Sequence, residues 1–185
     1  MKNKTIIIHL LALLFIISSC TSREYADLEQ TSFIPLPVSV VGAGGFFDFT
    51  PNTVLYYHPG SAGIEQTAEL IADQLSNVTG LDIDALPAEE PSGRGIYLEA
   101  GMEDAELGIE GYELRIDKRL VNIEAMTAAG CYYGAQTLLQ ILPAAADEDD
   151  KMSIPTGIIR DYPEYSYRGA MLDVARHFFG VEDVK

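Results

Sequence analysis

The chain has 185 residues, of which 48% are hydrophobic and 22% charged, and its 28 acidic against 12 basic residues give a formal net charge of −16 at pH 7. This excess of negative charge argues against nucleic acid or anionic lipid surfaces as partners of the folded part. About 165 residues remain after the leader described below, which is enough for one domain of ordinary size. A complete (β/α)8 barrel needs roughly 250 residues and does not fit.

The first twenty residues are typical of an export signal. Lys2 and Lys4 precede an apolar run over residues 10–17, and two serines then lead into Cys20. The run is too short to span a bilayer comfortably, and its basic and small-residue flanks are those of a signal peptide. The Ile-Ser-Ser-Cys ending resembles the bacterial lipobox, whose cysteine is acylated and becomes the new N-terminus. The alternative is an ordinary signal peptide with a chance cysteine.

We therefore expect a signal peptide over residues 1–19, lipidation of Cys20, and an exported lipoprotein held on a membrane at the periplasmic side or the cell surface. Loss of Lys2 and Lys4 takes the formal charge from −16 to −18. Cys131 is then the only other cysteine, so no disulfide framework is expected. The sequence has no His/Cys cluster, so it predicts no metal site, and we expect no cofactor.

The early elements are short. Residues 20–34 are polar and lack a period, which predicts a tether. Strands are expected over residues 38–41, 46–49 and 53–58, with Gly42-Ala43-Gly44-Gly45 as the turn between the first two. Residues 42–45 match no phosphate-binding pattern, and no helix follows them.

Two amphipathic helices are expected, over about residues 62–78 and 127–142. Their apolar residues recur at alternating spacings of four and three: Ile64, Ala68, Ile71, Leu75 and Val78 in the first, and Cys131, Ala135, Leu138 and Leu142 in the second. Each stripe needs a sheet to cover, so we expect both helices on the same face. Cys131 is interpreted as a small buried hydrophobe rather than a reactive thiol.

Strands are also expected over residues 96–99, 112–116 and 121–125, and the last two alternate apolar and polar residues as a half-buried antiparallel hairpin does. The predicted fold class is α+β: an antiparallel sheet with two helices on one face over residues 35–143. An acidic loop and an extended linker follow over residues 144–162. A second unit begins at Pro163 and runs to Lys185.

The stretch Tyr167 to Phe179 reads YRGAMLDVARHFF, a short apolar run bracketed by charged groups that need partners if they are buried. It closely resembles the first barrel strand of glycoside hydrolase family 20, the β-N-acetylhexosaminidases, and the "D-x-P-x-(F/Y)" approach to that strand is matched from Asp161 to Tyr165. The phrases "PLPVSV", "GYELRI" and "AAGCYYGAQTLLQIL" resemble the α+β domain that precedes the barrel. The resemblance covers residues 35–185.

The resemblance implies a retaining enzyme that removes terminal N-acetylglucosamine or N-acetylgalactosamine from glycans, with the substrate's acetamido oxygen as nucleophile. In the family an Asp-Glu pair on a later barrel strand orients the acetamide and acts as general acid/base, so no catalytic residue is expected in this chain. Asp147-Glu148 lies in the acidic loop and is interpreted as a solvated charge run.

The resemblance assigns Arg168 to the 3- and 4-hydroxyls of the terminal sugar, which its rigid fork suits. The alternative is a structural ion pair to a carboxylate of the barrel. Asp173 and His177 match the motif and are expected to orient the floor of the sugar pocket. With only the first strand of the barrel in the sequence, we expect a truncated and inactive chain. Related enzymes that share the N-terminal domain, such as O-GlcNAcase-like hydrolases or α-glucuronidases, lack this motif. A non-catalytic lipoprotein that binds glycans or acts as a scaffold is the alternative from another class.

Overall fold

The structure is a computed structural model that describes residues 27–142, 152–172 and 180–184. The predicted signal peptide, Cys20, Asp147-Glu148, Asp173 and His177 lie outside these residues. Within the described part of the chain, no helix has the length and apolar character needed to cross a membrane.

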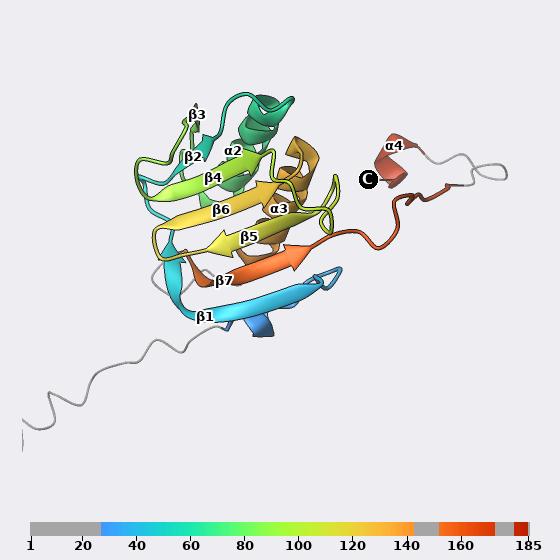
Figure 1. Cartoon of the computed structure of the whole chain (residues 1–185), viewed down its shortest axis with the longest axis horizontal. Coiled ribbons are helices and arrows are strands. Elements are labelled where there is room, and N and C mark those ends of the chain that lie inside the picture. Colours follow the sequence, from blue (N-terminus) through green and yellow to red (C-terminus); the bar gives the residue numbers. More distant parts are fainter. Residues whose placement is uncertain (1–26, 143–151, 173–179, 185) are drawn as a thin grey trace, which may run out of the picture.

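Seven strands form one sheet in the order β1-β7-β5-β6-β4-β2-β3, with β1 and β3 at its two edges (Figure 1). The strands are β1 Ser39–Asp48, β2 Val54–Tyr57, β3 Ala85–Pro87, β4 Gly95–Ala100, β5 Tyr112–Ile116, β6 Leu120–Ala125 and β7 Ser153–Asp161.

The sheet is antiparallel in one half and parallel in the other. The pairs β1–β7, β7–β5 and β5–β6 are antiparallel, and β5–β6 is the expected hairpin, closed by the Asp117 amide donating to the Leu120 carbonyl at 2.8 Å. The pairs β6–β4, β4–β2 and β2–β3 are parallel. The α+β class is confirmed, but the expected antiparallel sheet holds for only half of the pairs. Parallel neighbours need a long crossover, and the segment between β2 and β3 supplies one as a helix.

The two long helices are α2 Ile64–Thr79 and α3 Ala128–Ile141, and both predictions are confirmed within two residues. The helices contact each other and both pack on the sheet, so they lie on one face, behind the strands in Figure 1. Gln136 of α3 donates to Gln74 of α2 at 2.9 Å. The predicted stripes are buried, with the exception of Val78 in the last turn of α2, which is exposed.

Glycines let α3 lie close to the strands. A Cβ atom on Gly130 would be 2.5 Å from the carbonyl oxygen of Gly111, and one on Gly134 would be 2.6 Å from a methyl group of Ile123. Real Cβ atoms do not approach this closely, so only glycine allows the observed packing. The small residues of this helix therefore act in packing.

The turn expected at residues 42–45 is wrong. β1 is one strand that pairs with β7 on both sides of an irregularity, with Gly42 opposite Gly157 and Phe46 opposite Pro155. Gly44 has φ 68° and Gly45 φ 152°, a region that glycine reaches without a Cβ penalty. The glycines therefore make a bulge that absorbs extra residues within the strand.

The linker expected over residues 144–162 is wrong for its second half. Residues 153–161 are β7, which lies between β1 and β5, and its Ile154 and Ile159 are fully buried. β7 pairs with residues more than 100 positions away, such as Ser39 opposite Arg160, and no local pattern reports such a partner. The sheet therefore ends at Asp161.

The tether expected over residues 20–34 is also too long. A short 3-10 helix, η1 Leu28–Gln30, packs on β1 and β7, and Leu28 is only 1% exposed. Phe33 is buried as well, and the amide of Ile34 donates to the side chain of Gln140 at 2.9 Å. The folded domain therefore includes residues 27–34, which were expected in the tether.

Candidate substrate-binding region around Arg168

A cavity of about 580 Å³ lies where the chain leaves the sheet. Its lining comes from residues 34–38 before β1, from α3, from the end of β7 and the residues that follow it, and from Glu110 and Tyr112 at the start of β5. Much of its wall is apolar, contributed by side chains such as Ile34, Leu36 and Tyr133 that are exposed to solvent. Arg168, the predicted sugar-binding residue, is on its rim together with Glu110.

A small polar cluster forms one wall of this cavity. The hydroxyl of Tyr112 is 2.5 Å from that of Thr137 and 3.5 Å from a carboxylate oxygen of Asp161. The other carboxylate oxygen of Asp161 accepts from the amide of Val38 at 3.2 Å. Asp161 therefore connects the residue that precedes β1 to the end of β7.

Burial controls the ionisation of this cluster. Desolvation raises the pKa of Tyr112 far above the ordinary phenol value, so its hydroxyl stays protonated. Burial also raises the pKa of Asp161, against the opposing effect of the Val38 amide. The cavity thus carries a carboxylate that is less acidic than usual beside a hydroxyl that cannot ionise near neutral pH.

Arg168 donates hydrogen bonds to a carboxylate and to a backbone carbonyl. One terminal nitrogen donates to Glu110 at 2.8 Å, and the other donates to the carbonyl of Tyr165 at 2.7 Å. The Glu110 carboxylate raises the pKa of Arg168 further. Arg168 therefore forms an ion pair with the folded domain, whereas the alternative to a sugar contact named a carboxylate of the barrel, so that alternative also stays a prediction. The sugar contact of Arg168 stays a prediction.

Sequence reasoning named Arg168 but missed its neighbours. Glu110 lies in the loop between β4 and β5, where nothing in the sequence marks it as a partner of Arg168. Asp161 was part of the quoted "D-x-P" approach, yet its bonds to Val38 and Tyr112 depend on long-range strand pairing. The roles predicted for Asp173 and His177 fall on residues outside the described ones and stay predictions.

Two further kinds of group could carry chemistry: the thiol of Cys131 and sets of side chains that could bind a metal ion. Burial raises the pKa of the Cys131 thiol to about 12, and its sulfur lies against the carbonyls of Glu99 and Ile123. This agrees with the interpretation of Cys131 as a packing residue. In residues 27–142, 152–172 and 180–184 no group of three or more His, Cys, Asp or Glu is placed to hold a metal ion.

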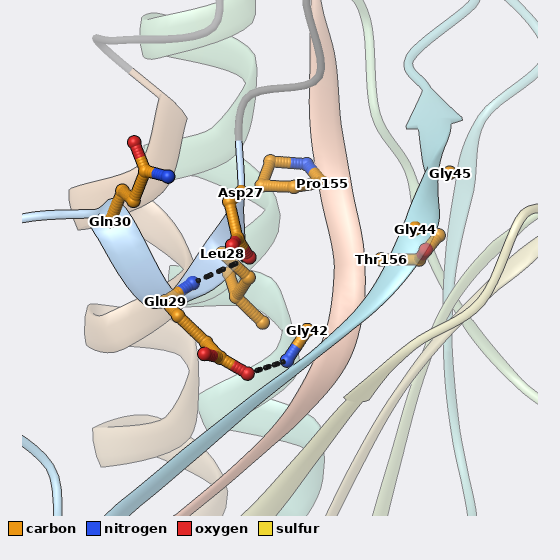
Figure 2. Close-up of a pocket in the computed structure, with 9 residues that line it drawn as sticks. All are labelled: Asp27, Leu28, Glu29, Gln30, Gly42, Gly44, Gly45, Pro155 and Thr156. Atoms are coloured by element: carbon orange, nitrogen blue, oxygen red, sulfur yellow. Dashed lines mark hydrogen bonds between the residues drawn. The ribbon is translucent and has the colours of Figure 1, made fainter.

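A second hollow, of about 350 Å³, lies between η1 and the bulge of β1 (Figure 2). Asp27 accepts from the amide of Glu29 at 3.1 Å, and Glu29 accepts from the amide of Gly42 at 3.0 Å. Both carboxylates are thus engaged by backbone amides, and Glu29 covers an amide of the edge strand. We interpret η1 as a cover for the edge of the sheet, which natural sheets protect from unwanted pairing.

Comparison with known proteins agrees with the fold. Residues 30–162 match the family described as "Glycosyl hydrolase family 20, domain 2". The chain is 39% identical to a β-hexosaminidase of Porphyromonas gingivalis over 159 residues, which is 83% of this chain and 20% of the relative. It is 30% identical to a β-N-acetylhexosaminidase of Cellulomonas fimi over 159 residues, 85% of this chain and 31% of that relative.

Solved structures give the same result. The chain superposes on a GH20 β-N-acetylhexosaminidase of Streptomyces coelicolor with a TM-score of 0.64 and 33% identity, over 81% of this chain and 30% of that one. A Flavobacterium johnsoniae chitobiase gives 0.63 and 29%, over 83% and 24%. The chain thus spans between a fifth and a third of the length of these proteins. It belongs to glycosyl hydrolase family 20 and carries domain 2 of that family at residues 30–162.

Proposed function

We propose that the chain is the N-terminal part of a retaining exo-β-N-acetylhexosaminidase, which removes terminal N-acetylglucosamine or N-acetylgalactosamine from glycans by substrate-assisted hydrolysis. One observation carries the proposal. The family 20 domain ends at residue 162, and the motif that resembles the first barrel strand follows directly, with Arg168 at its start. Domain and motif thus occur in the order that the family resemblance implies.

In this proposal Arg168 binds the sugar and performs no proton transfer. Its planar guanidinium donates two parallel hydrogen bonds to the 3- and 4-hydroxyls. The acetamido oxygen of the substrate attacks the anomeric carbon as the glycosidic bond breaks. The Asp of a pair on a later barrel strand holds the acetamide, and the protonated Glu of that pair donates its proton to the leaving oxygen. Glu110 competes for Arg168 in this chain, because it accepts from one of the two terminal nitrogens that the sugar would use.

The 185-residue chain by itself is proposed to be inactive, because catalysis needs both carboxylates placed to a fraction of an ångström. The test is hydrolysis of 4-nitrophenyl N-acetyl-β-glucosaminide and the corresponding galactosaminide by the purified chain. We expect no turnover above buffer. Turnover that survives Glu148→Gln would contradict the proposal outright. Turnover lost in that variant would show that Asp147-Glu148 is catalytic after all.

The role of Arg168 is tested in a polypeptide that joins this chain to a complete family 20 barrel. Arg168→Ala is expected to lower kcat/KM, with a loss of transition-state stabilisation of roughly 2 kcal/mol or more, because a charged hydrogen bond to the sugar is lost. Arg115→Ala is the matched control, since Arg115 is exposed, pairs with Glu113 and lies on the sheet face away from the helices. Equal activity in the two variants would contradict the sugar contact.

A non-catalytic glycan-binding or scaffolding lipoprotein is the second candidate, and the open cavity beside Arg168 is the observation in its favour. Calorimetric titration with N-acetylglucosamine separates the two. A binding module would bind the sugar with this chain alone and lose the affinity in Arg168→Ala. The enzyme proposal expects no measurable binding by the chain alone, because Glu110 holds the guanidinium.

Membrane anchoring through Cys20 belongs to the same proposal. Acylation of one cysteine by more than one chain would hold the protein on a membrane, where a single chain is marginal. Cys20→Ser is expected to abolish acyl labelling and membrane retention while secretion stays possible. Partition of the unmodified protein into the aqueous phase of a detergent extraction would contradict the anchor.

A further inference from the structure

An open hollow lies at the end of β5 that is opposite to the Arg168 cavity. It has a volume of about 490 Å³ and takes its lining from the bulge of β1, the β5–β6 turn and β7: Ala43, Gly44, Asp117, Lys118, Arg119 and Thr156. β5 begins with Tyr112 beside Asp161 and ends with Ile116 beside Gly157, so the two cavities lie at opposite ends of that strand (Figure 1). The hollow is therefore separate from the site proposed to bind the terminal sugar.

Three basic side chains beside this hollow have no acidic partner, and we call Arg94, Lys118 and Arg119 the basic corner. In residues 27–142, 152–172 and 180–184, every other lysine or arginine pairs with a carboxylate, namely Arg115, Arg160 and Arg168. Lys118 and Arg119 form no ion pair with a described residue, and Arg94 donates to the main-chain carbonyls of Asp48 and Lys118. Asp117 is the acid that lines the hollow, so basic groups outnumber acidic lining groups in a chain with a formal charge of −16.

A buried hydroxyl lines the same hollow. Thr156 of β7 is only 5% exposed, and its side chain makes no hydrogen bond within the part of the chain that the structure describes. Its Oγ1 atom and the Cε atom of Lys118 each lie 3.1 Å from the point that a Cβ atom on Gly45 would occupy. Glycine thus leaves open the space where the hydroxyl and the lysine converge. A buried polar group without a partner costs free energy, so this hydroxyl points to a ligand.

We propose that the basic corner binds a small oxyanion, a sulfate or phosphate group, in this hollow. Lysine and arginine donate charge-assisted hydrogen bonds to such oxygens, and the Thr156 hydroxyl supplies a neutral donor. The acidic chain as a whole repels polyanions, whereas a single small anion in the hollow stays within the screening length of about 8 Å of the cations that line it. The group has two sources, the free ion and a sulfate ester on a sugar. The site does not depend on the proposed function.

The test is a titration of the 185-residue chain with sodium sulfate, sodium phosphate and N-acetylglucosamine 6-sulfate, followed through the backbone amide signals in NMR spectra. Sodium chloride holds the ionic strength constant, because salt screens exposed charges. We expect saturable shifts at the amides that surround the hollow, such as those of Gly44, Gly45 and Lys118. The amides beside the Arg168 cavity should not shift with the inorganic anions.

Variants separate a built site from general charge. Lys118→Ala and Arg119→Ala are each expected to weaken sulfate binding at least about tenfold, as the loss of a charge-assisted hydrogen bond does. Arg115→Ala is the matched control, because it removes the same charge from β5, but from a side chain that pairs with Glu113. Its affinity for sulfate should stay close to that of the parent.

Thr156→Val removes the hydroxyl and keeps a branched side chain. We expect weaker sulfate binding together with an unchanged or higher urea midpoint of the ligand-free chain, because the lost hydroxyl had no partner. A lower midpoint with unchanged sulfate affinity would mean that Thr156 has a structural role alone, and it would overturn its place in the site.

The remaining outcomes distinguish the source of the anion and decide the proposal. Tighter binding of N-acetylglucosamine 6-sulfate than of sulfate, with no shift around the hollow from N-acetylglucosamine itself, supports a sugar ester as the ligand. Binding of the sulfated sugar no tighter than that of sulfate supports the free ion. The absence of a saturable shift with all three anions overturns the site. Equal losses of affinity in Lys118→Ala and Arg115→Ala also overturn it, because overall charge would then be the cause.

Discussion

The folded domain, residues 27–161, and the segment that leaves it, residues 162–172, bury their apolar side chains very differently. In the domain, large residues from strands and helices such as Phe47, Leu114 and Leu138 are fully buried. In the leaving segment, Tyr167 is 89% and Met171 91% exposed, and Leu172 is more than half exposed. The apolar run that suits a buried strand therefore gains no burial from the domain beside it.

The apolar side chains of domain 2 thus bury one another without help from the leaving segment. The described part of the motif that contains Arg168, residues 167–172, buries none of its own large apolar side chains in that core. Only a few polar contacts join the two, among them the ion pair between Arg168 and Glu110. Changes in the domain should therefore alter the free energy of unfolding, and equivalent changes in the leaving segment should not.

The largest effect is expected from truncating a buried leucine. Leu138→Ala removes a fully buried side chain of α3 and should lower the free energy of unfolding by about 2–5 kcal/mol. Leu172→Ala is the matched change in the leaving segment and should stay within about 0.5 kcal/mol. Urea unfolding followed by circular dichroism measures both. Comparable losses would show that the leaving segment has a core of its own.

A pair of glycines gives the next largest contrast. Gly130→Ala places a Cβ atom 2.5 Å from the carbonyl of Gly111 and 2.7 Å from the Cβ atom of Ala125, so it should cost about 1–3 kcal/mol of stability. Gly169→Ala places its Cβ atom no closer than 3.6 Å to Tyr167, an ordinary contact. We expect no change in its unfolding midpoint. A Gly130→Ala protein as stable as the parent would refute the close packing of α3.

Two carboxylates should respond to pH in opposite directions. Burial raises the pKa of Asp161 above its ordinary value of 3.8, so the folded state keeps a proton that the unfolded state has lost, and stability falls as pH rises through that window. The hydrogen bond to Arg160 lowers the pKa of Asp104, so its contribution is lost as pH falls below 3.8.

Asp161→Asn should remove the first dependence and Asp104→Asn the second. The measurement is the free energy of unfolding of parent and variants from about pH 3 to 7, compared as differences because other carboxylates titrate in the same range. Asparagine can still accept from the Val38 amide, so Asp161→Asn should fold. A parent–variant difference with the same sign of slope at both positions would contradict the assignment.

The smallest effect is expected at the pair that joins the two regions. Arg168→Ala breaks the ion pair with Glu110, which is partly exposed, and should change the stability of the chain by less than about 1 kcal/mol. Its stability in high salt should match that of the parent, since salt screens such pairs. A loss as large as that of Leu138→Ala would mean that the leaving segment is part of the domain.

Local patterns predicted the parts of the fold whose causes are local. The two helices follow from apolar spacing, and the β5–β6 hairpin follows from alternation across a tight connection. β7 was mistaken for a linker because its partners in β1 and β5 are all distant in the sequence, those in β1 by more than 100 residues, and the β1 bulge was mistaken for a turn because glycines suit both. At the site, the motif alone indicated Arg168, whereas Glu110 and the Asp161–Tyr112 contact arise only from tertiary packing.

Native-state hydrogen exchange tests most directly whether the domain ends at Asp161. The account predicts that the paired amides of β7 exchange only through global unfolding, as slowly as those of β5 and β6, while the amides of residues 164–172 exchange at nearly unprotected rates. Protection of residues 164–172 equal to that of β7, or a β7 that exchanges freely while β5 stays protected, would contradict it.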